Sequence, residues 1–180
     1  MRVPSFLISF MVPALVVAGC SAKDDPPEQG TLNINFTSAQ AAVVTETLTT
    51  FVFDATGSPN LCLQLVSARS SAQVQPAWPV APIATGPTVT TCDMLTRPVG
   101  LPPVSFGERA VAVLGFSSTG AEWMIGCTQL SLGEGNFPLP ITMVPIHSTV
   151  NNLPGPFNQA LAGTKCTTLG QYCATKSCPQ

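Results

Sequence analysis

The residues of this chain that could carry chemistry are seven cysteines, one histidine and nine acidic side chains. Cysteine and histidine can hold a metal ion or exchange electrons, histidine can act as a general base, and two carboxylates can share acid–base work. Each of these uses requires the groups to converge. Their spacing here favours disulfide bonds over the other uses.

Six cysteines lie in the body of the chain, and an even number in an exported protein is typical of disulfides. They are Cys62, Cys92, Cys127, Cys166, Cys173 and Cys178. Spacing alone does not select one pairing. We favour Cys62 with Cys127, because both fall in segments expected to form core strands, and Cys92 with a C-terminal cysteine. A loop of about 65 residues closed in this way gains about 4 kcal/mol in the chain-entropy model.

A metal or redox site is the alternative use of these cysteines. Structural zinc is usually held by close pairs of ligands, and the sequence contains no C-x-x-C. A Cys3His site made by the C-terminal cysteines and His147 remains an alternative. The missing C-x-x-C also argues against a thiol oxidoreductase. We expect no metal and no cofactor.

Hydrolase chemistry has no recognisable motif either. His147 could serve as the base of a serine triad, but no G-x-S-x-G occurs, and "GFSSTG" at 115–120 has the wrong spacing. A glycosidase-like pair of carboxylates is open to acidic residues that are scattered along the chain. They are Glu46, Asp54, Asp93, Glu108, Glu122 and Glu134. We therefore expect no enzymatic activity, with a hydrolase that uses an unrecognised site as the alternative.

The composition is that of a folded chain with few charges. Charged residues make up 9% of the sequence, against about 25% in typical domains, while 45% are hydrophobic. The net charge is −2, and the seven basic residues do not cluster. Binding to nucleic acid needs clustered cations, so we expect none. Electrostatic attachment to anionic lipid is excluded for the same reason.

The first 20 residues have the layout of an export signal. Arg2 is followed by an uncharged apolar stretch from Val3 to Ala18. A transmembrane anchor is the alternative, but Pro4 and Pro13 interrupt the stretch, which is slightly short for a bilayer core of about 30 Å.

The end of this signal, Val17-Ala18-Gly19-Cys20, resembles the lipobox of bacterial lipoproteins. The resemblance implies a lipoprotein signal peptide over residues 1–19, cleavage before Cys20, and attachment of diacylglycerol, typically with palmitate chains, to the Cys20 sulfur. Two or more chains make the anchor stable, because each buried CH₂ contributes about 0.8 kcal/mol. Ser21 in place of Asp implies the outer membrane if the cell is Gram-negative. The alternative is cleavage elsewhere, with Cys20 as an ordinary disulfide partner.

Composition divides the rest of the chain into three segments. Residues 20–30 contain the lipidated cysteine and a flexible tether, SAKDDPPEQG, which reaches about 35 Å at most. A β domain is expected over 31–146. A cysteine-rich C-terminal extension, which disulfides would staple to the domain, is expected over 147–180.

Short apolar, β-branched segments between turn residues predict the fold of the domain. They are Leu32–Thr37, Leu48–Phe53, Leu61–Val66, Thr88–Cys92, Ala110–Phe116, Ala121–Leu130 and Leu139–Val144. Seven such strands predict a mainly β fold, an antiparallel two-sheet β-sandwich. One or two helical turns are expected within Ala39–Thr47 and within Phe157–Ala162.

Two stretches, "FVFDATGSPNLCLQL" and "AVAVLGFSSTGAEWMIGCTQLSL", resemble immunoglobulin-like or transthyretin-like sandwiches of exported bacterial lipoproteins. The resemblance implies an architecture and no active site.

The aromatic residues divide into one loop residue and several strand residues. Ser67–Pro87 is rich in proline and has Trp78 as its only aromatic. It is either a binding loop that presents Trp78 or a crossover whose Trp78 caps the core. The strand patterns predict core positions for Phe51, Phe53, Phe106, Phe116 and Trp123. Alternation along 121–130 places Trp123, Ile125 and Cys127 on one inward face.

We therefore expect a lipid-anchored protein of the cell envelope with a binding or structural role. Its partners would be the membrane, through Cys20, and an envelope protein or polysaccharide. An envelope hydrolase is the alternative.

Overall fold

Strands make up most of the regular structure in the computed structural model, which describes residues 30–71, 77–133, 138–146 and 169–175. In chain order the elements are β1 (Thr31–Phe36), α1 (Ala39–Val44), β2 (Thr47–Asp54), α2 (Leu61–Ser71), β3 (Ala84–Thr85), β4 (Val89–Thr90), α3 (Asp93–Thr96), β5 (Val99–Gly100), β6 (Gly107–Phe116), β7 (Glu122–Leu132), β8 (Pro138–Pro145) and α5 (Leu169–Thr175). In these ranges no helix is long and apolar enough to cross a membrane.

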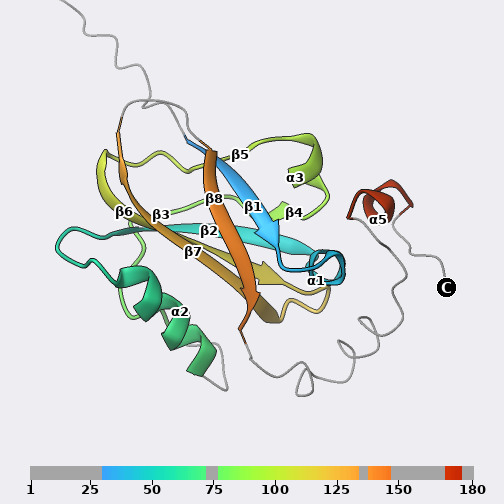
Figure 1. Ribbon diagram of the computed structural model, residues 1–180, viewed down its shortest axis with the longest axis horizontal. Coiled ribbons are helices and arrows are strands. Elements are labelled where there is room, and N and C mark those ends of the chain that lie inside the picture. Colours follow the sequence, from blue (N-terminus) through green and yellow to red (C-terminus); the bar gives the residue numbers. More distant parts are fainter. Residues whose placement is uncertain (1–29, 72–76, 134–137, 147–168, 176–180) are drawn as a thin grey trace, which may run out of the picture.

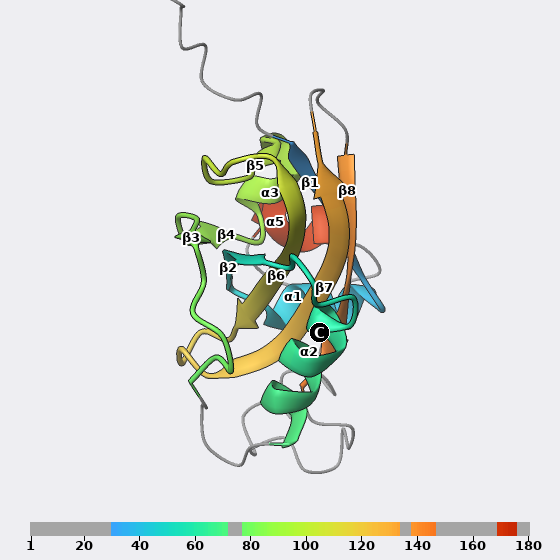
Figure 2. The same ribbon diagram turned by 90° about the vertical axis from the view of Figure 1, so that its left-hand side faces the viewer.

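The strands form one mixed sheet that curls into a half-barrel, so the fold is mainly β (Figures 1 and 2). The strand order is β3-β2-β6-β7-β8-β1-β5, with β4 also paired to β2. Strands β1 and β8 run parallel over their six paired residues, Thr31–Phe36 beside Pro138–Met143. The predicted antiparallel two-sheet sandwich is therefore wrong. Alternation reveals which side chains point inward, but it does not reveal which strands pair.

Strand β8 lies between β7 and β1 in the strand order, and the sheet curls at this strand. It pairs with β7 only where Met124 and Ile125 meet Pro145 and Val144. Just beyond, the Ile146 N–H donates to the Trp123 carbonyl at 2.8 Å. Backbone N–H groups alternate between the two edges of a strand. The N–H groups of the even-numbered residues of β8 therefore point toward β7.

Two of the even-numbered residues of β8, whose N–H groups would point toward β7, are prolines. Pro138 and Pro140 have no N–H to offer to β7, so the ladder between β7 and β8 cannot continue along this part of the strand. The odd-numbered N–H groups remain available to β1, which pairs with β8 over the whole length of β1. The prolines thus keep the ladder with β7 from resuming along the first part of β8, where β8 pairs with β1.

Gly126 allows β8 to cross β7 at close range. A Cβ atom at this position would lie 2.5 Å from Ile141 Cγ2 and 2.8 Å from the Thr142 carbonyl oxygen, closer than real contacts allow. The crossing brings the β1–β8 layer over β6 and β7.

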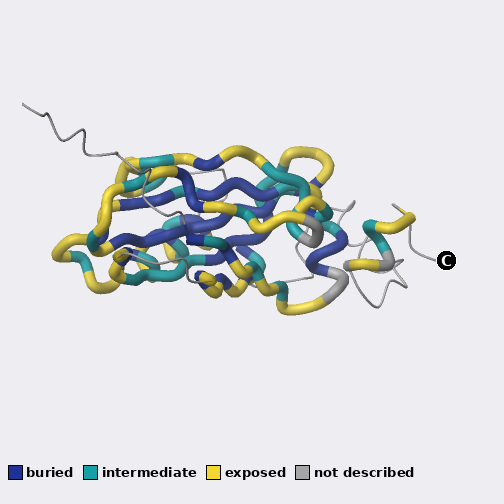
Figure 3. Tube along the Cα trace, turned by 90° about the horizontal axis from the view of Figure 1, so that it is seen from above, coloured by how far each residue is buried: buried dark blue, intermediate teal, exposed yellow. Residues whose placement is uncertain are grey.

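The space inside the curl is the main hydrophobic core. Its buried members come from both layers and include Leu32, Leu48, Val52, Val111, Val113, Trp123, Met124, Ile141 and Met143. The opposite face of β2 and β6 carries Phe53, Ala110 and Ala112, which pack against Leu61 and Leu65 of α2. The buried segments lie side by side along the middle strands, with exposed loops around them (Figure 3).

A β-bulge at Trp123 changes the alternation of β7. Gly115 pairs with Met124, but Phe116 pairs with Glu122, so the register between β6 and β7 shifts by one residue at Trp123. Trp123 and Met124 therefore both enter the core inside the curl, whereas Ile125 and Cys127 face the other side. The prediction that Trp123, Ile125 and Cys127 share one face is wrong.

Trp123 in turn fastens α1. Its Nε1–H donates to Thr45 Oγ1 at 3.1 Å, and the Thr45 hydroxyl donates to the Ala41 carbonyl at 2.8 Å. Ser38 caps the helix by accepting from the Ala41 N–H at 3.1 Å. The helical turns predicted within Ala39–Thr47 are confirmed, while Phe157–Ala162 lies outside the described residues.

The predicted strand Leu61–Val66 is the first half of helix α2 instead. A short apolar run does not distinguish a strand from a helix. Here Leu61 and Leu65, four residues apart, form the buried stripe of the helix. The predicted strand Thr88–Cys92 is reduced to the two residues of β4.

The crossing at Gly126 can be tested with two glycine substitutions. Gly126→Ala places a methyl group against β8, so we expect it to lower the free energy of unfolding by about 1–3 kcal/mol. Gly133→Ala is the matched control, because nothing lies within 4 Å of its Cβ position, and we expect a change below about 0.5 kcal/mol. Urea denaturation measures both. Equal stabilities of the two variants would contradict the close crossing.

Candidate functional site

Several of the residues singled out from the sequence lie around helix α2 or around the turn before β6. The first attachment of α2 is the disulfide Cys62–Cys127, which confirms the favoured pairing. The reason given for it was partly wrong, since Cys62 lies on a helix and the bond ties that helix to β7. A second attachment comes from Gln129 of β7, whose Oε1 accepts from the Leu61 N–H at 3.1 Å and whose Nε2 donates to the Ser58 carbonyl at 2.8 Å. The Gln129 amide thus adds to the Leu61 N–H to Ser58 carbonyl bond of 3.2 Å where α2 begins.

The far end of α2 is held by a buried ion pair. Arg69 continues the stripe of Leu61 and Leu65, and its side chain is only 6% exposed. One terminal nitrogen, Nη1, lies 2.9 and 2.7 Å from the two carboxylate oxygens of Glu122, which is 12% exposed. The Arg69 Nε is buried and has no hydrogen-bond partner in the described structure. Such a pair holds position firmly, because removing either charge leaves the other buried alone.

Trp78 lies directly beneath this arginine. The Arg69 guanidinium sits 4.0 Å from the centre of the indole, a cation–π contact. The indole also makes edge contacts with Phe51 and Phe53, with ring centres 5.2 and 5.1 Å apart. These contacts favour a capping role for Trp78 over presentation in a binding loop. Within the Ser67–Pro87 connection, residues 67–71 belong to α2, and 72–76 lie outside the described residues.

A second buried arginine organises the turn before β6. Arg109 of β6 has five N–H groups, and every one of them donates a hydrogen bond, at distances of 2.8 to 3.2 Å. The acceptors are the Ser105 carbonyl, the Ser105 hydroxyl, the Phe106 carbonyl, the Glu108 carbonyl and Asp54 Oδ1. Arg109 thereby joins the turn to the end of β2.

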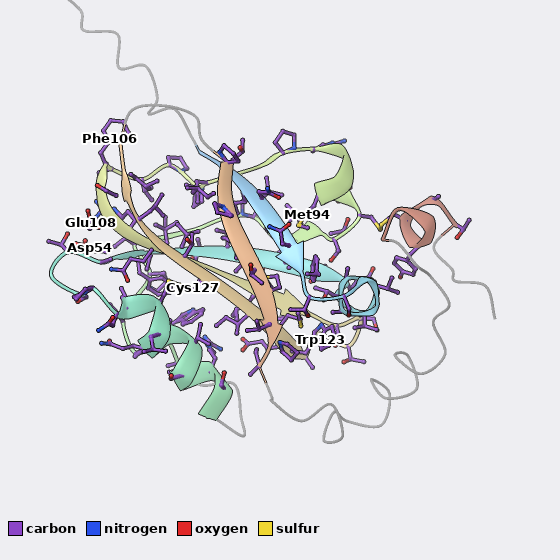
Figure 4. The ribbon with its side chains drawn as sticks, viewed as in Figure 1. Asp54, Met94, Phe106, Glu108, Trp123 and Cys127 are labelled. Atoms are coloured by element: carbon purple, nitrogen blue, oxygen red, sulfur yellow. A yellow bond between two sulfur atoms is a disulfide. The ribbon has the colours of Figure 1, made fainter. Side chains whose placement is uncertain are left out.

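The turn itself places Phe106 outside the core. The Phe106 side chain is 47% exposed, so its predicted core position is wrong. Gly107, which follows it, has a φ of +126°, a conformation that other residues rarely adopt. The glycine ends the turn and starts β6. The dipeptide Phe106-Gly107 was the sequence signal for this turn. Figure 4 shows Phe106, Asp54 and Glu108 at one end of the structure and Trp123 at the other.

The candidate carboxylates occupy different settings. Glu122 is in the ion pair with Arg69. Asp93 begins α3, where its Oδ2 accepts from the Thr90 hydroxyl at 2.7 Å. Glu46, Asp54 and Glu108 are exposed. Among the described residues, no three histidine, cysteine or acidic side chains form a group that could hold a metal. Glu134 and His147 lie outside the described residues.

Asp54 has a perturbed acidity. Its Oδ1 accepts from the Thr56 hydroxyl at 2.7 Å and from the Thr56 N–H at 3.1 Å, and it pairs with Arg109 at 2.9 Å. These hydrogen bonds, followed by the charge of Arg109, hold the pKa of Asp54 below its usual value of 3.8. The carboxylate is therefore a structural acceptor that stays ionised.

A second disulfide attaches the C-terminal part. Cys92, which precedes α3, is bonded to Cys173 of α5, so the predicted pairing of Cys92 with the C-terminal extension is confirmed. Helix α5 lies against α1. Partial burial, followed by the charge of Glu46, raises the pKa of Tyr172 on α5 above 10.0. Cys20, Cys166 and Cys178 lie outside the described residues.

One surface that no described helix covers has no charged side chains. It is the outer face of β1 and β8, here called the β1–β8 face, and it carries Asn33, Asn35, Pro138, Pro140, Thr142 and Val144. Asn33 lies beside Pro140, and Asn35 lies beside Thr142. These strands stand in front of the others in Figure 1, with no described helix over them.

No protein-family model, no curated protein and no solved structure matches this chain.

The Arg69–Glu122 pair can be tested by a double-mutant cycle. Glu122→Gln leaves the guanidinium buried without its counter-charge, so we expect a loss of about 3 kcal/mol in the free energy of unfolding. Arg69→Met in the same chain removes the stranded charge, so the double variant should lose less than the sum of the single losses. Urea denaturation of the four proteins gives the coupling. Strictly additive losses would show that Arg69 and Glu122 are not coupled.

The Asp54 contacts predict a pH dependence. Since the folded pKa lies below the unfolded value of 3.8, the stabilisation is complete above that value and is lost as the pH falls through the folded pKa. Unfolding measured against pH should show this acid-induced loss in the wild type and a smaller loss in Asp54→Asn. Glu108→Gln leaves the contacts of Asp54 in place and should behave as the wild type. Identical profiles for all three proteins would refute this role.

Proposed function

We propose that this protein is a lipid-anchored module of the cell envelope, attached through Cys20, and that it acts by binding or as a structural component rather than by catalysis. The lipobox resemblance of Val17–Cys20 and the apolar stretch before it support the anchor. The sorting residue Ser21 supports the outer membrane of a Gram-negative cell as its location.

The observation that carries this proposal is the short distance along the chain between the lipid site and the fold. Strand β1 begins at Thr31, and the carbonyl of the preceding Gly30 accepts from the Leu101 N–H at 2.9 Å. Only residues 21–29 separate Cys20 from this fastened position. At about 3.5 Å per residue, an anchored domain stays within roughly 35 Å of the bilayer whatever path those residues take.

The β1–β8 face supports a binding or structural role. Its asparagine side chains can both donate and accept hydrogen bonds, and its neighbouring prolines and Thr142 present a surface without charge. An uncharged face suits a neutral partner, because it offers hydrogen bonds and contact area without a need for opposite charges. A polysaccharide or an uncharged patch of an envelope protein has that chemistry.

The lipid anchor is tested by replacing its sulfur. We expect the wild type to incorporate labelled palmitate and to partition into the detergent phase, and Cys20→Ser to lose both properties. Ser21→Ala keeps the Cys20 sulfur and serves as the control that retains the label. Mass spectrometry of the amino-terminal peptide identifies the cleavage site and the acyl chains. Recovery of Cys20→Ser in membranes at mature mass plus lipid would contradict the proposal.

A further inference from the structure

Phe106 is unusual among the exposed apolar side chains of this protein. Five large apolar side chains in the described structure are more than a third exposed, namely Leu63, Val80, Ile83, Phe106 and Val144. Phe106 is the only aromatic one. Apolar aromatic side chains such as phenylalanine occur on protein surfaces that lie in the bilayer interface, because the ring can be buried at the boundary between headgroups and acyl chains.

The backbone of the turn that carries Phe106 is fixed by hydrogen bonds within the protein. Three of the five hydrogen bonds of Arg109 go to Ser105 and Phe106 themselves, and a fourth goes to the Glu108 carbonyl. The left-handed conformation of Gly107 completes the turn. These bonds hold the backbone that carries the ring, so the turn loses little backbone freedom on contact, and this makes a small contact surface more effective.

The turn lies at the end of the domain where the chain arrives from Cys20. Gly30 is bonded to Leu101, and Thr31 pairs with Gly100, only a few residues before Phe106 in the chain. Figures 1 and 2 agree that the start of β1, strand β5 and the beginning of β8 lie at this upper end, with α2 at the lower end.

From these observations we propose that the Phe106 turn, residues Pro103–Gly107, contacts the lipid surface to which Cys20 is attached. This inference rests on the proposed lipid anchor. A single phenylalanine contributes at most about 2–3 kcal/mol on burial, which is too little for binding from solution. The tether makes the contact intramolecular, so a weak interaction is sufficient to set how the domain faces the membrane.

The charges beside the turn limit the contact to the bilayer interface. Asp54 and Glu108 are both exposed at this end. The donors of Arg109 are all used inside the protein, so it cannot attract lipid phosphates. The carboxylates remain hydrated, and they repel anionic headgroups. The geometry therefore fits a shallow contact with a zwitterionic lipid surface.

The experiment uses the full lipidated protein in phosphatidylcholine vesicles whose acyl chains carry bromine near the headgroup. Phe106→Trp places a fluorescent ring in the turn, and Leu63→Trp places one on the exposed face of α2 as the control. The wild type supplies the background emission of Trp78 and Trp123. We expect brominated lipid to reduce the added emission in Phe106→Trp and to leave that of Leu63→Trp unchanged.

Further measurements separate this inference from the proposed anchor. Mass spectrometry first establishes whether Cys20 carries lipid; a protein without lipid that does not bind vesicles would overturn the anchor. If the anchored protein binds and both added tryptophans respond equally, the lipid contact is overturned. Replacing part of the phosphatidylcholine with phosphatidylglycerol should weaken the quenching at low salt, and stronger quenching would overturn the shallow, carboxylate-limited contact. Capture of an envelope protein that Phe106→Ala abolishes, without any quenching, would assign the turn to a protein partner instead.

Discussion

The passage of β8 across β7 at Gly126 is the constraint on which the other features of this fold depend. The missing side chain lets Ile141 and Thr142 lie against the backbone of β7, closer than any Cβ atom would allow. Strand β8 pairs with β7 over two residues only and with β1 over six, and Pro138 and Pro140 cannot donate toward β7 along the first part of β8. A single sheet thereby covers both sides of one core, and the β1–β8 face is turned to the outside.

The opposite side of the sheet depends on helix α2. Three different interactions hold it there: the disulfide Cys62–Cys127, the amide of Gln129 at its first turn, and the buried pair of Arg69 and Glu122 at its far end. The ion pair also stacks over Trp78, which closes the cluster around Phe51 and Phe53. Among the described residues, Cys62, Cys127 and Glu122 make these structural contacts. The proposed contact surfaces are the uncharged β1–β8 face and the exposed Phe106, whose backbone carbonyl accepts from Arg109.

Local patterns predicted part of this arrangement. Alternation in β1 and short apolar, β-branched runs elsewhere identified the strands that became β1, β2, β6, β7 and β8, but most residues in the middle of β2 and β6 are buried on both faces. These patterns failed at Leu61–Val66, where an apolar run shorter than two helical turns fits a strand equally well. Alternation failed again at Trp123, because the bulge in β7 puts Trp123 on the same face as Met124. Whether a bulge forms depends on the register between β7 and β6. Phe106 was misjudged because the hydrogen bonds that lift it outward come from Arg109, whose role is invisible in the sequence.

The sequence by itself determined the properties that depend on local order: the lipobox-like motif Val17–Cys20, the ten residues between Cys20 and Thr31, the low charge, and most of the strands. These follow from residue type and period alone. The tertiary structure decided what depends on residues far apart in the chain. It placed β1 parallel to β8, joined Cys62 on a helix to Cys127 on a strand, and buried two arginines against distant carboxylates. Such pairings depend on how the whole chain packs, and no local pattern records them.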